Sequence, residues 1–286
     1  MERKKMTPQE LLTKKQQGKK IVRITCYDYP MALLADRAGI DCILVGDSLS
    51  MVVLGMNSTV PVTMEEMIHH CKAVMRAVKY ALVIGDLPFL SYQTSTRDAI
   101  YNAGLLMKVG GVDAVKLEGG QEFAPTVKAI VDAGIPVVGH IGLTPQTVSK
   151  LGGYKVQGTD ATTARKLIED AKALEAAGVF MFTLECIPDL LAELICKRLT
   201  VPATSLGCGP NTDGQALNLY DMLGLFDKFT PKFVKKYANL SQDILRALEQ
   251  YKEEVEQSVF PGPEHSFHIK DEVLKEVLKN NTDDRN

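Results

Sequence analysis

The sequence of 286 residues predicts an α/β protein of the (βα)8 TIM-barrel class, and two observations support this prediction. Short apolar runs alternate strictly with longer segments in which apolar residues recur at helical spacing. The runs are apolar at almost every position, as is typical of parallel strands that are buried on both faces. Seven runs within residues 23–206 are too many for one half of a nucleotide-binding sheet, and the chain is long enough for a barrel of roughly 250 residues with extensions.

The apolar runs and the segments between them define the expected elements. Three helical segments end in glycine directly before the next strand, at Gly39, Gly134 and Gly178, where helix C-caps are usual. A barrel needs an eighth strand, and KFVKKY at 232–237 is the best remaining candidate. We expect strands at 23–27, 42–46, 81–85, 113–117, 135–139, 179–184 and 201–206, with helices over MALLADRAG, MEEMIHHCKAVMRAVKY, RDAIYNAGLLMKVGG, QEFAPTVKAIVDAG, ATTARKLIEDAKALEAAG and PDLLAELICKRL.

Both ends of the chain carry helices outside this alternation. The sequence TPQE has the form of a capping box with proline at the first helical position, which predicts a short, basic, solvated helix over about 7–17. A charged helix and a last helix near 271–279 predict a C-terminal helical extension over about 240–280, followed by a polar end that frays. We therefore expect residues 1–286 to form a single barrel domain with two helical extensions.

Composition and charge argue against several classes of function. The net charge of −2 is unlike that of a general binder of nucleic acids or polyanions. No apolar run approaches the roughly 20 residues that span a bilayer, and the first residues lack the apolar centre of a signal peptide. The six cysteines form no C-x-x-C pair, and because no signal peptide is recognised we expect a reducing, cytoplasmic location. Neither GGYKVQGT nor GCGPNTDG has the pattern of a nucleotide-binding loop.

The run DAVKLEGG indicates where the strands place polar side chains. Residues two apart in a strand point to the same face, so Lys116 and Glu118 share one face while Val115 and Leu117 share the other. The apolar pair belongs against the helix layer. Lys116 and Glu118 are therefore expected to point into the mouth of the barrel.

Four further polar residues lie at the same ends of neighbouring strands. Asp47, Asp86, His140 and Glu185 each come at the carboxyl end of an expected strand. Barrels of this class place their active sites at that end. Five neighbouring strands therefore bring acids, a lysine and a histidine to one rim, which predicts a catalytic site.

Helix capping is the alternative explanation for an acidic residue that follows a strand. It is the interpretation we favour for Asp28, which directly precedes Tyr29 and Pro30. The helices after Asp47 and Asp86 begin well beyond these residues, so a role in the site is expected for both.

The charges at this rim constrain the chemistry. Carboxylates on adjacent strands repel one another, and one lysine is insufficient to neutralise them. Oxygen ligands without clustered cysteine or histidine favour Mg²⁺ first and Mn²⁺ second, whereas zinc would need more histidines than His140. A Mg²⁺ with few protein ligands leaves room for a chelating 2-oxo acid, whose enolate it would stabilise. Glu185 would then be free to act as the base.

Across roughly residues 20–270, the chain resembles the ketopantoate hydroxymethyltransferase family. The resemblance implies a barrel of the phosphoenolpyruvate/pyruvate-binding type, assembled as a homodecamer of stacked pentamers. It also implies transfer of a hydroxymethyl group from methylene-tetrahydrofolate to 3-methyl-2-oxobutanoate in pantothenate biosynthesis. The matching stretches are YDYPMALLADRAGID, ILVGDSLSMVVLGMNSTVPVT, GDLPFLSYQ, AVKLEGG, GIPVVGHIGLTPQ, LGGYKVQG, LEAAGVFMFTLECIP and FPGPEHSFH.

Carried over position by position, the resemblance implies roles for individual residues. Glu185 matches the proton acceptor, and Glu118 matches a metal ligand that acts through water. Ser48 and Lys116 match the groups that hold the substrate carboxylate. The implied metal ligands are Asp47, Asp86 and Glu118, and the implied substrate-binding residues are Asp47, Ser48, Asp86, Lys116 and His140.

The chain departs from the family at one edge of the barrel. A glycine run is replaced by SLGCGP, with Ser205 and Cys208, whereas NTDGQ keeps Asp213 and Gly214. We expect this edge to border the folate. The long, glycine-rich segment 145–160 suggests a lid that excludes water, with a static surface loop as the alternative.

Three alternatives to this function remain open on the sequence. A Mg²⁺-dependent carbon–carbon lyase or phosphonomutase acting on a 2-oxo acid would not require a folate donor. A Schiff-base mechanism through Lys116 would leave a covalent adduct after borohydride treatment with substrate. A non-catalytic scaffold would take up neither Mg²⁺ nor the oxo acid.

Overall fold

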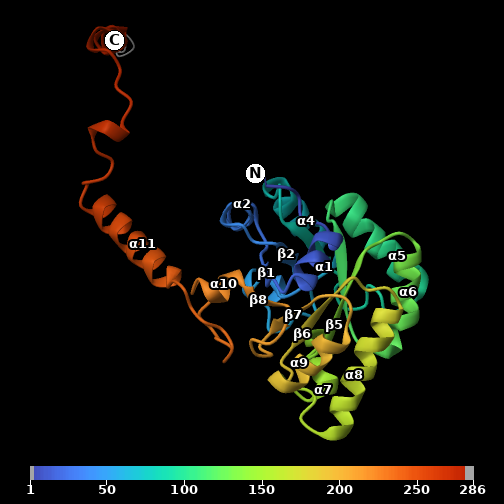
Figure 1. Ribbon diagram of the computed structural model, residues 1–286. Helices are drawn as coiled ribbons and strands as arrows, with labels where there is room; N and C mark the ends of the chain where they lie inside the picture. Colours follow the sequence, from blue (N-terminus) through green and yellow to red (C-terminus); the bar gives the residue numbers. More distant parts are fainter. Residues whose placement is uncertain (1–2, 281–286) are drawn as a thin grey trace. The chain divides into compact units, whose positions relative to one another are not determined.

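The computed structural model describes residues 3–280, which divide into a barrel unit ending at Ala238 and a C-terminal unit beginning at Asn239. In the barrel unit, parallel strands close into a ring in the order β1 to β8, and β8 pairs with β1 (Figure 1). The predicted (βα)8 fold is confirmed. The strands are β1 Ile21–Thr25, β2 Cys42–Val45, β3 Leu82–Asp86, β4 Ala114–Glu118, β5 Val137–Gly142, β6 Met181–Glu185, β7 Ala203–Leu206 and β8 Gly214–Asn218.

Two apolar layers stabilise the barrel. Val115 and Leu117 pack with the helices in a large outer cluster, whereas Ala114 belongs to a smaller cluster inside the barrel. Because alternate residues share a face, this arrangement directs Lys116 and Glu118 inward, as the sequence predicts. All seven predicted strands occur, each displaced by no more than a few residues.

The helices around the barrel begin and end at the expected local signals. The side chain of Asp28 accepts a hydrogen bond of 2.9 Å from the backbone N–H of Met31, so its predicted role as an N-cap is confirmed. Gly39 ends the same helix in the left-handed conformation, with a φ of 91°. The helices of the barrel unit after the first are α2 Tyr29–Ala38, α3 Leu49–Val52, α4 Met64–Ala77, α5 Thr96–Leu105 with the π-helix Leu106–Gly110, η2 Gln121–Phe123, α6 Ala124–Asp132, η3 Pro145–Thr147, α7 Val148–Leu151, α8 Ala161–Ala176, α9 Asp189–Arg198 and α10 Leu219–Met222.

The eighth strand lies elsewhere than predicted. Residues 232–237 form no strand, and β8 is instead the polar segment GQALN, which pairs with β1 along its full length. A side chain on Gly214 would place its Cβ 2.1 Å from the carbonyl oxygen of Ile21, so only glycine permits this close approach. The prediction was wrong because β8 is specified by pairing with its neighbours and not by an apolar run of its own.

The N-terminal helix α1 Pro8–Gln16 has the predicted capping box, but it is not simply a solvated helix. Leu11 is fully buried in the cluster inside the barrel. Lys14 pairs with Asp41 just before β2, and Lys15 pairs with Asp213 just before β8 at 2.9 Å. The helix therefore closes the amino-terminal end of the barrel, opposite the predicted site.

The C-terminal unit contains α11 Leu240–Glu256, a short helical turn Pro263–His265 and α12 Asp271–Asn280. The two predicted C-terminal helices are thus present, while the polar end at 281–286 lies outside the described residues. Apolar residues recur three or four positions apart along both helices, which gives each one an apolar face. None of the helices within residues 3–280 is long and apolar enough to cross a bilayer.

Candidate active site

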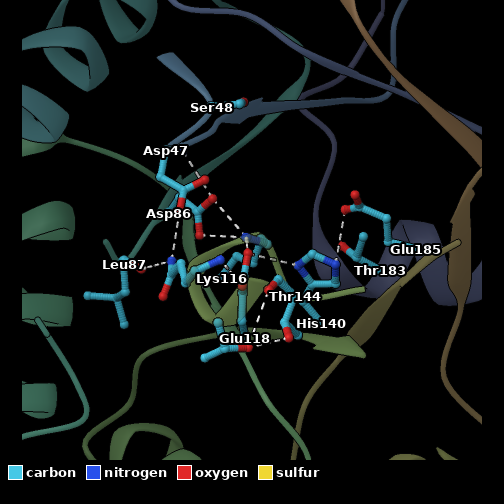
Figure 2. A network of polar contacts seen from close by, with 12 residues as sticks. Asp47, Ser48, Asp86, Leu87, Lys116, Glu118, His140, Thr144, Thr183 and Glu185 are labelled. Carbon is cyan, nitrogen blue, oxygen red and sulfur yellow. Dashed lines mark hydrogen bonds and ion pairs between the residues drawn. The ribbon is translucent and has the colours of Figure 1, made fainter. Parts of the chain in front are cut away.

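The carboxyl ends of β2 to β6 bring the predicted polar residues together inside the mouth of the barrel (Figure 2). Parallel register places Asp86 beside Lys116 and Glu118 beside His140 on adjacent strands. Asp86, Lys116, Glu118 and His140 are each no more than 2% exposed, so their interactions are poorly screened by water. Four carboxylates, termed here the acid cluster, belong to Asp47, Asp86, Glu118 and Glu185.

Lys116 lies at the centre of this arrangement. Its Nζ donates to both carboxylate oxygens of Asp86 at 2.8 Å and to Oε1 of Glu118 at 3.3 Å. Burial alone would lower the pKa of Lys116, but the neighbouring carboxylates raise it above its ordinary value. The amine is therefore held in its charged form, which disfavours the Schiff-base alternative because that route needs a neutral nucleophile.

His140 stands between two acids. Its Nδ1 is 3.4 Å from Oε1 of Glu118, and its Nε2 is 3.2 Å from Oε2 of Glu185. Neither contact has the geometry of a full hydrogen bond, so the interaction is best described as ion pairing. Burial and the charge of Lys116 oppose protonation of His140, but its contacts with the two glutamates outweigh them and raise its pKa. A protonated ring can serve both acids, whereas a neutral ring has one N–H and can serve only one.

The remaining acids show that the site carries more negative charge than its own cations neutralise. Burial, and then the charge of Asp86, raise the pKa of Asp47 well above its ordinary value, and burial also raises the pKa of Asp86. Burial alone would raise the pKa of Glu118, but the positive charge of Lys116 and the contact with His140 outweigh it and lower the pKa to about 2. Raised pKa values at two neighbouring aspartates are typical of buried carboxylates whose combined negative charge is only partly neutralised.

Arg23 is a second buried cation that the sequence analysis did not identify. It is 2% exposed inside the barrel, and its Nη1 donates to Oγ1 of Thr183 at 2.7 Å. Burial lowers the pKa of Arg23 to about 10, while the negative charges of Asp86 and Glu185 oppose this shift, so the guanidinium stays charged at neutral pH. The four carboxylates of the acid cluster thus face two permanent cations, Arg23 and Lys116, with His140 as a third when protonated.

Gln146 is a further site residue that the sequence did not reveal. From the short helix η3 its Nε2 donates to Oδ2 of Asp47 at 2.9 Å, and its backbone N–H donates to Oε2 of Glu118 at 3.0 Å. Its Oε1 accepts from the hydroxyl of Tyr92 at 2.9 Å. The residue was in a matching stretch, GLTPQ, but nothing in the sequence shows that it is only 3% exposed. It links two members of the acid cluster.

The base candidate Glu185 is fixed by the strand beside it. The backbone carbonyl of Glu185 accepts from the N–H of Leu143 at 2.8 Å. Gly142, with a φ of 99°, passes so close that a Cβ there would lie 2.2 Å from the same oxygen. A glycine is therefore required where β5 supports the end of β6.

Asp213 does not lie at the site, contrary to the expectation that its edge borders the folate. It precedes β8 at the amino-terminal end of the barrel, where its carboxylate accepts from Ala203 N–H and pairs with Lys15. Ser205 and Cys208 are buried and bonded to each other, with Ser205 Oγ accepting from Cys208 N–H at 2.8 Å. These departures from the family pattern are therefore accommodated by internal packing.

The segment 145–160 lies beside the acid cluster. It contains η3 and α7, and the hydroxyl of Tyr154 is 3.8 Å from the sulfur of Met51 after β2. A cavity of about 330 Å³ separates part of the segment from β4, and its lining includes Glu118, Thr144, Lys150 and Gln157. Its predicted role as a lid remains a prediction.

Ser48, the last predicted site residue, follows Asp47 at the end of β2 and is half-buried. Its Oγ is 2.8 Å from the hydroxyl of Tyr27. The structure thus brings all seven predicted residues to the carboxyl end of the barrel: Asp47, Ser48, Asp86, Lys116, Glu118, His140 and Glu185.

Comparison of the sequence with known proteins identifies a family whose match covers the whole barrel. Residues 5–263 match the family model described as ketopantoate hydroxymethyltransferase. A 3-methyl-2-oxobutanoate hydroxymethyltransferase of Moorella thermoacetica is 60% identical over 266 residues, which cover 93% of this chain and 99% of the relative. The enzyme of the same name from Enterococcus faecalis is 54% identical, covering 92% of this chain and 96% of the relative.

Solved structures with low sequence identity share the fold. Phosphonopyruvate hydrolase matches with a TM-score of 0.60 at 12% identity, over 98% of this chain and 96% of its own. A 2,3-dimethylmalate lyase, a member of the PEP mutase/isocitrate lyase superfamily, matches with a TM-score of 0.58 at 14% identity, over 96% and 98%. These proteins therefore share the (βα)8-barrel fold of this chain. The family match and the close relatives show that this chain belongs to the ketopantoate hydroxymethyltransferase family.

Proposed function

We propose that this enzyme transfers a hydroxymethyl group from methylene-tetrahydrofolate to 3-methyl-2-oxobutanoate, giving 2-dehydropantoate in pantothenate biosynthesis. The observation that carries the proposal is the buried acid cluster, whose four carboxylates outnumber the cations beside them, while the recorded partner of the Glu185 carboxylate is His140 and that of Asp86 is Lys116. The close relatives are named for the same reaction, which supports the choice of oxo acid.

The donor set fits Mg²⁺, with Mn²⁺ as the second choice. Asp47 and Asp86 offer hard carboxylate oxygens, which these ions prefer. Within residues 3–280 no three Asp, Glu, His or Cys side chains converge as a ready-made metal site. Both carboxylate oxygens of Asp86 accept from Lys116, so direct ligation by Asp86 requires one of these bonds to be released, whereas Glu118, whose Oε1 contacts Lys116 and His140, would act through water. When bound, the metal would polarise the ketone of the oxo acid and stabilise its enolate.

Glu185 is the proposed base. Its side chain is 12% exposed, more than those of Asp86, Glu118 and His140, and therefore the most accessible of these groups to an incoming substrate. It would take the single proton from C3 of 3-methyl-2-oxobutanoate, and the resulting carbanion would form the new bond to the one-carbon unit. The two bonds between that carbon and the folate nitrogens break, water supplies the hydroxyl of the product, and the nitrogens take up one proton from water and the one held by Glu185, so that tetrahydrofolate leaves.

Lys116 and Ser48 are proposed to hold the substrate carboxylate. All three protons of the Lys116 ammonium have acceptors on Asp86 and Glu118. Contact with a substrate therefore requires one of these bonds to be released, and the longest is the 3.3 Å bond to Glu118. His140 would remain beside the base as a polar contact on the substrate side.

The Asp86→Asn variant tests the metal assignment. The substitution removes one carboxylate charge while keeping the shape of the side chain, so the Mg²⁺ concentration for half-maximal activity should rise at least about tenfold, since even outer partners of metal ligands usually contribute that much. The measurement is product formation across a Mg²⁺ titration. Asp132→Asn, which alters an exposed ion pair on α6, is the matched control and should leave the titration unchanged. An unaltered Mg²⁺ dependence in folded Asp86→Asn would show that Asp86 is not a ligand.

Two further predictions concern the competing class of reaction and the assembly of the protein into oligomers. A carbon–carbon lyase or phosphonomutase on this fold would turn over without the folate donor, and the close relatives favour the transferase. Homo-oligomers, and the decamer implied by family resemblance, remain a prediction, as does the cytoplasmic location. The apolar faces of α11 and α12 are compatible with contacts between copies.

A further inference from the structure

Three polar side chains from three neighbouring strand ends form a hydrogen-bonded chain that the proposed reaction does not yet use. Asn218 is the last residue of β8, Tyr27 follows β1, and Ser48 follows β2. Nδ2 of Asn218 is 2.6 Å from the hydroxyl of Tyr27, which is 2.8 Å from Oγ of Ser48. This series of hydrogen bonds therefore ends at Ser48, a residue proposed to hold the substrate.

The orientation of the Asn218 amide is fixed by the helix that follows it. Oδ1 of Asn218 accepts a hydrogen bond of 3.0 Å from the backbone N–H of Tyr220 at the start of α10. The oxygen is thereby committed to the helix, and the NH₂ group must face Tyr27. Asn218 is a donor to Tyr27 and cannot be an acceptor from it.

The direction of the second bond follows from burial. The Tyr27 side chain is fully buried, and its ring packs edge-on against the ring of Tyr220, with the two ring centroids 5.4 Å apart. Its hydroxyl oxygen accepts from Asn218, so its own proton needs an acceptor to avoid the cost of a buried unsatisfied donor. Oγ of Ser48 is the acceptor within reach, so Tyr27 donates to Ser48.

Ser48 then has a proton left to give. It stands at the N-cap position of α3 but makes no side-chain capping bond, and among residues 3–280 Tyr27 is the partner recorded for its hydroxyl. Since its oxygen already accepts from Tyr27, the proton of this half-buried hydroxyl remains available for donation to a ligand.

We propose that Asn218 and Tyr27 are positioning residues that polarise this chain, so that Ser48 presents a proton and not a lone pair to an anionic oxygen of the substrate. The inference rests on the proposed role of Ser48 in holding the oxo-acid carboxylate. It adds the reason why this hydroxyl binds an anion: the amide of Asn218, locked by α10, sets the direction of every bond in the chain.

The Asn218→Asp variant reverses the direction of the hydrogen bonds between residue 218, Tyr27 and Ser48, and it hardly changes the shape of the side chain. A carboxylate still caps α10 but accepts the Tyr27 proton, so Tyr27 must then accept from Ser48, whose proton turns away from the substrate. We expect the KM for 3-methyl-2-oxobutanoate to rise about 10- to 100-fold, with kcat changed far less and the melting temperature almost unaltered. Tyr27→Phe, which breaks the chain without adding charge, should raise KM in the same direction.

The Ser48→Ala background separates a positioning effect from simple charge repulsion. If Asn218 acts through Ser48, Asn218→Asp should raise KM in the wild type and add nothing in Ser48→Ala. An equal rise in both backgrounds would overturn the inference, because the new charge would be acting directly.

Two further outcomes would also overturn the inference, and they differ in what they say of the proposed function. If Ser48→Ala raises KM while Asn218→Asp and Tyr27→Phe stay within twofold of wild type, the polarised chain is refuted and the substrate role of Ser48 survives. If Ser48→Ala itself leaves KM unchanged, the proposed substrate role of Ser48 fails and the inference falls with it.

Discussion

Replacing Glu185 with glutamine is expected to slow exchange of the methine proton of 3-methyl-2-oxobutanoate in D₂O by about 10²–10⁴-fold. Glutamine keeps the size of the side chain and can still contact His140, but it cannot accept the proton. The contact recorded for the Glu185 carboxylate is the 3.2 Å approach to Nε2 of His140, so the substitution leaves the Asp86–Lys116 pair intact. Proton NMR of the substrate, with Mg²⁺ and folate present to complete the site, measures the exchange.

Mg²⁺ affinity provides the internal control for this variant. It should hardly change, because Glu185 is not proposed to touch the metal. Glu169→Gln, at an exposed position of α8, should exchange at the wild-type rate. Exchange near the wild-type rate in Glu185→Gln would show that another group takes the proton, with His140 the next candidate. Collapse of metal binding would instead show that Glu185 is a ligand.

Replacing Lys116 with alanine is expected to weaken binding of the oxo acid roughly 10- to 200-fold, the effect of losing one charge-assisted contact of about 1.5–3 kcal/mol. The structure adds a second expectation. Removing a buried ammonium leaves Asp86 and Glu118 without their partner, and breaking a buried ion pair typically costs about 3–5 kcal/mol of stability. The free energy of unfolding, from urea denaturation, and the equilibrium affinity for the oxo acid test the two expectations separately.

The stability loss in Lys116→Ala should depend on pH. Without Lys116, burial would raise the pKa of Asp86 further above its unfolded value of about 4, so the folded variant takes up a proton as pH falls and gains stability relative to the wild type. The deficit should therefore be largest at pH 7 and shrink towards pH 5. Lys128→Ala, in an exposed ion pair, should cost less than about 1 kcal/mol at either pH. A pH-independent deficit, or oxo-acid affinity within twofold of wild type, would refute the role given to Lys116.

The positions of the candidate site residues could be predicted because strand periodicity and barrel geometry together decide where their side chains point. Asp47 and Asp86 end buried strands, and a single alternation rule separates Lys116 from Val115. No chemical knowledge of the substrate was needed to place them at one end of the barrel. The parallel register then brings Lys116 within 2.8 Å of Asp86.

The residues that sequence reasoning missed are those whose roles depend on tertiary contacts. Gln146 lies in an ordinary-looking loop and becomes part of the site only because η3 folds over the acid cluster. Arg23 interrupts an apolar strand, a signal that could have identified it as an inward-facing charge. β8 and Asp213 were misplaced for one reason: the loop from Gly207 to Asp213 returns to the amino-terminal end without a helix, which the alternating pattern does not anticipate.

Formation of 2-dehydropantoate from 3-methyl-2-oxobutanoate, with and without methylene-tetrahydrofolate and with and without EDTA, tests the central claim most directly. A Mg²⁺-dependent transferase forms product only when the folate donor is present and the Mg²⁺ is not chelated by EDTA. Added Mg²⁺ restores the activity that EDTA removes. Full product formation in excess EDTA, or consumption of the oxo acid without the folate donor, would contradict it.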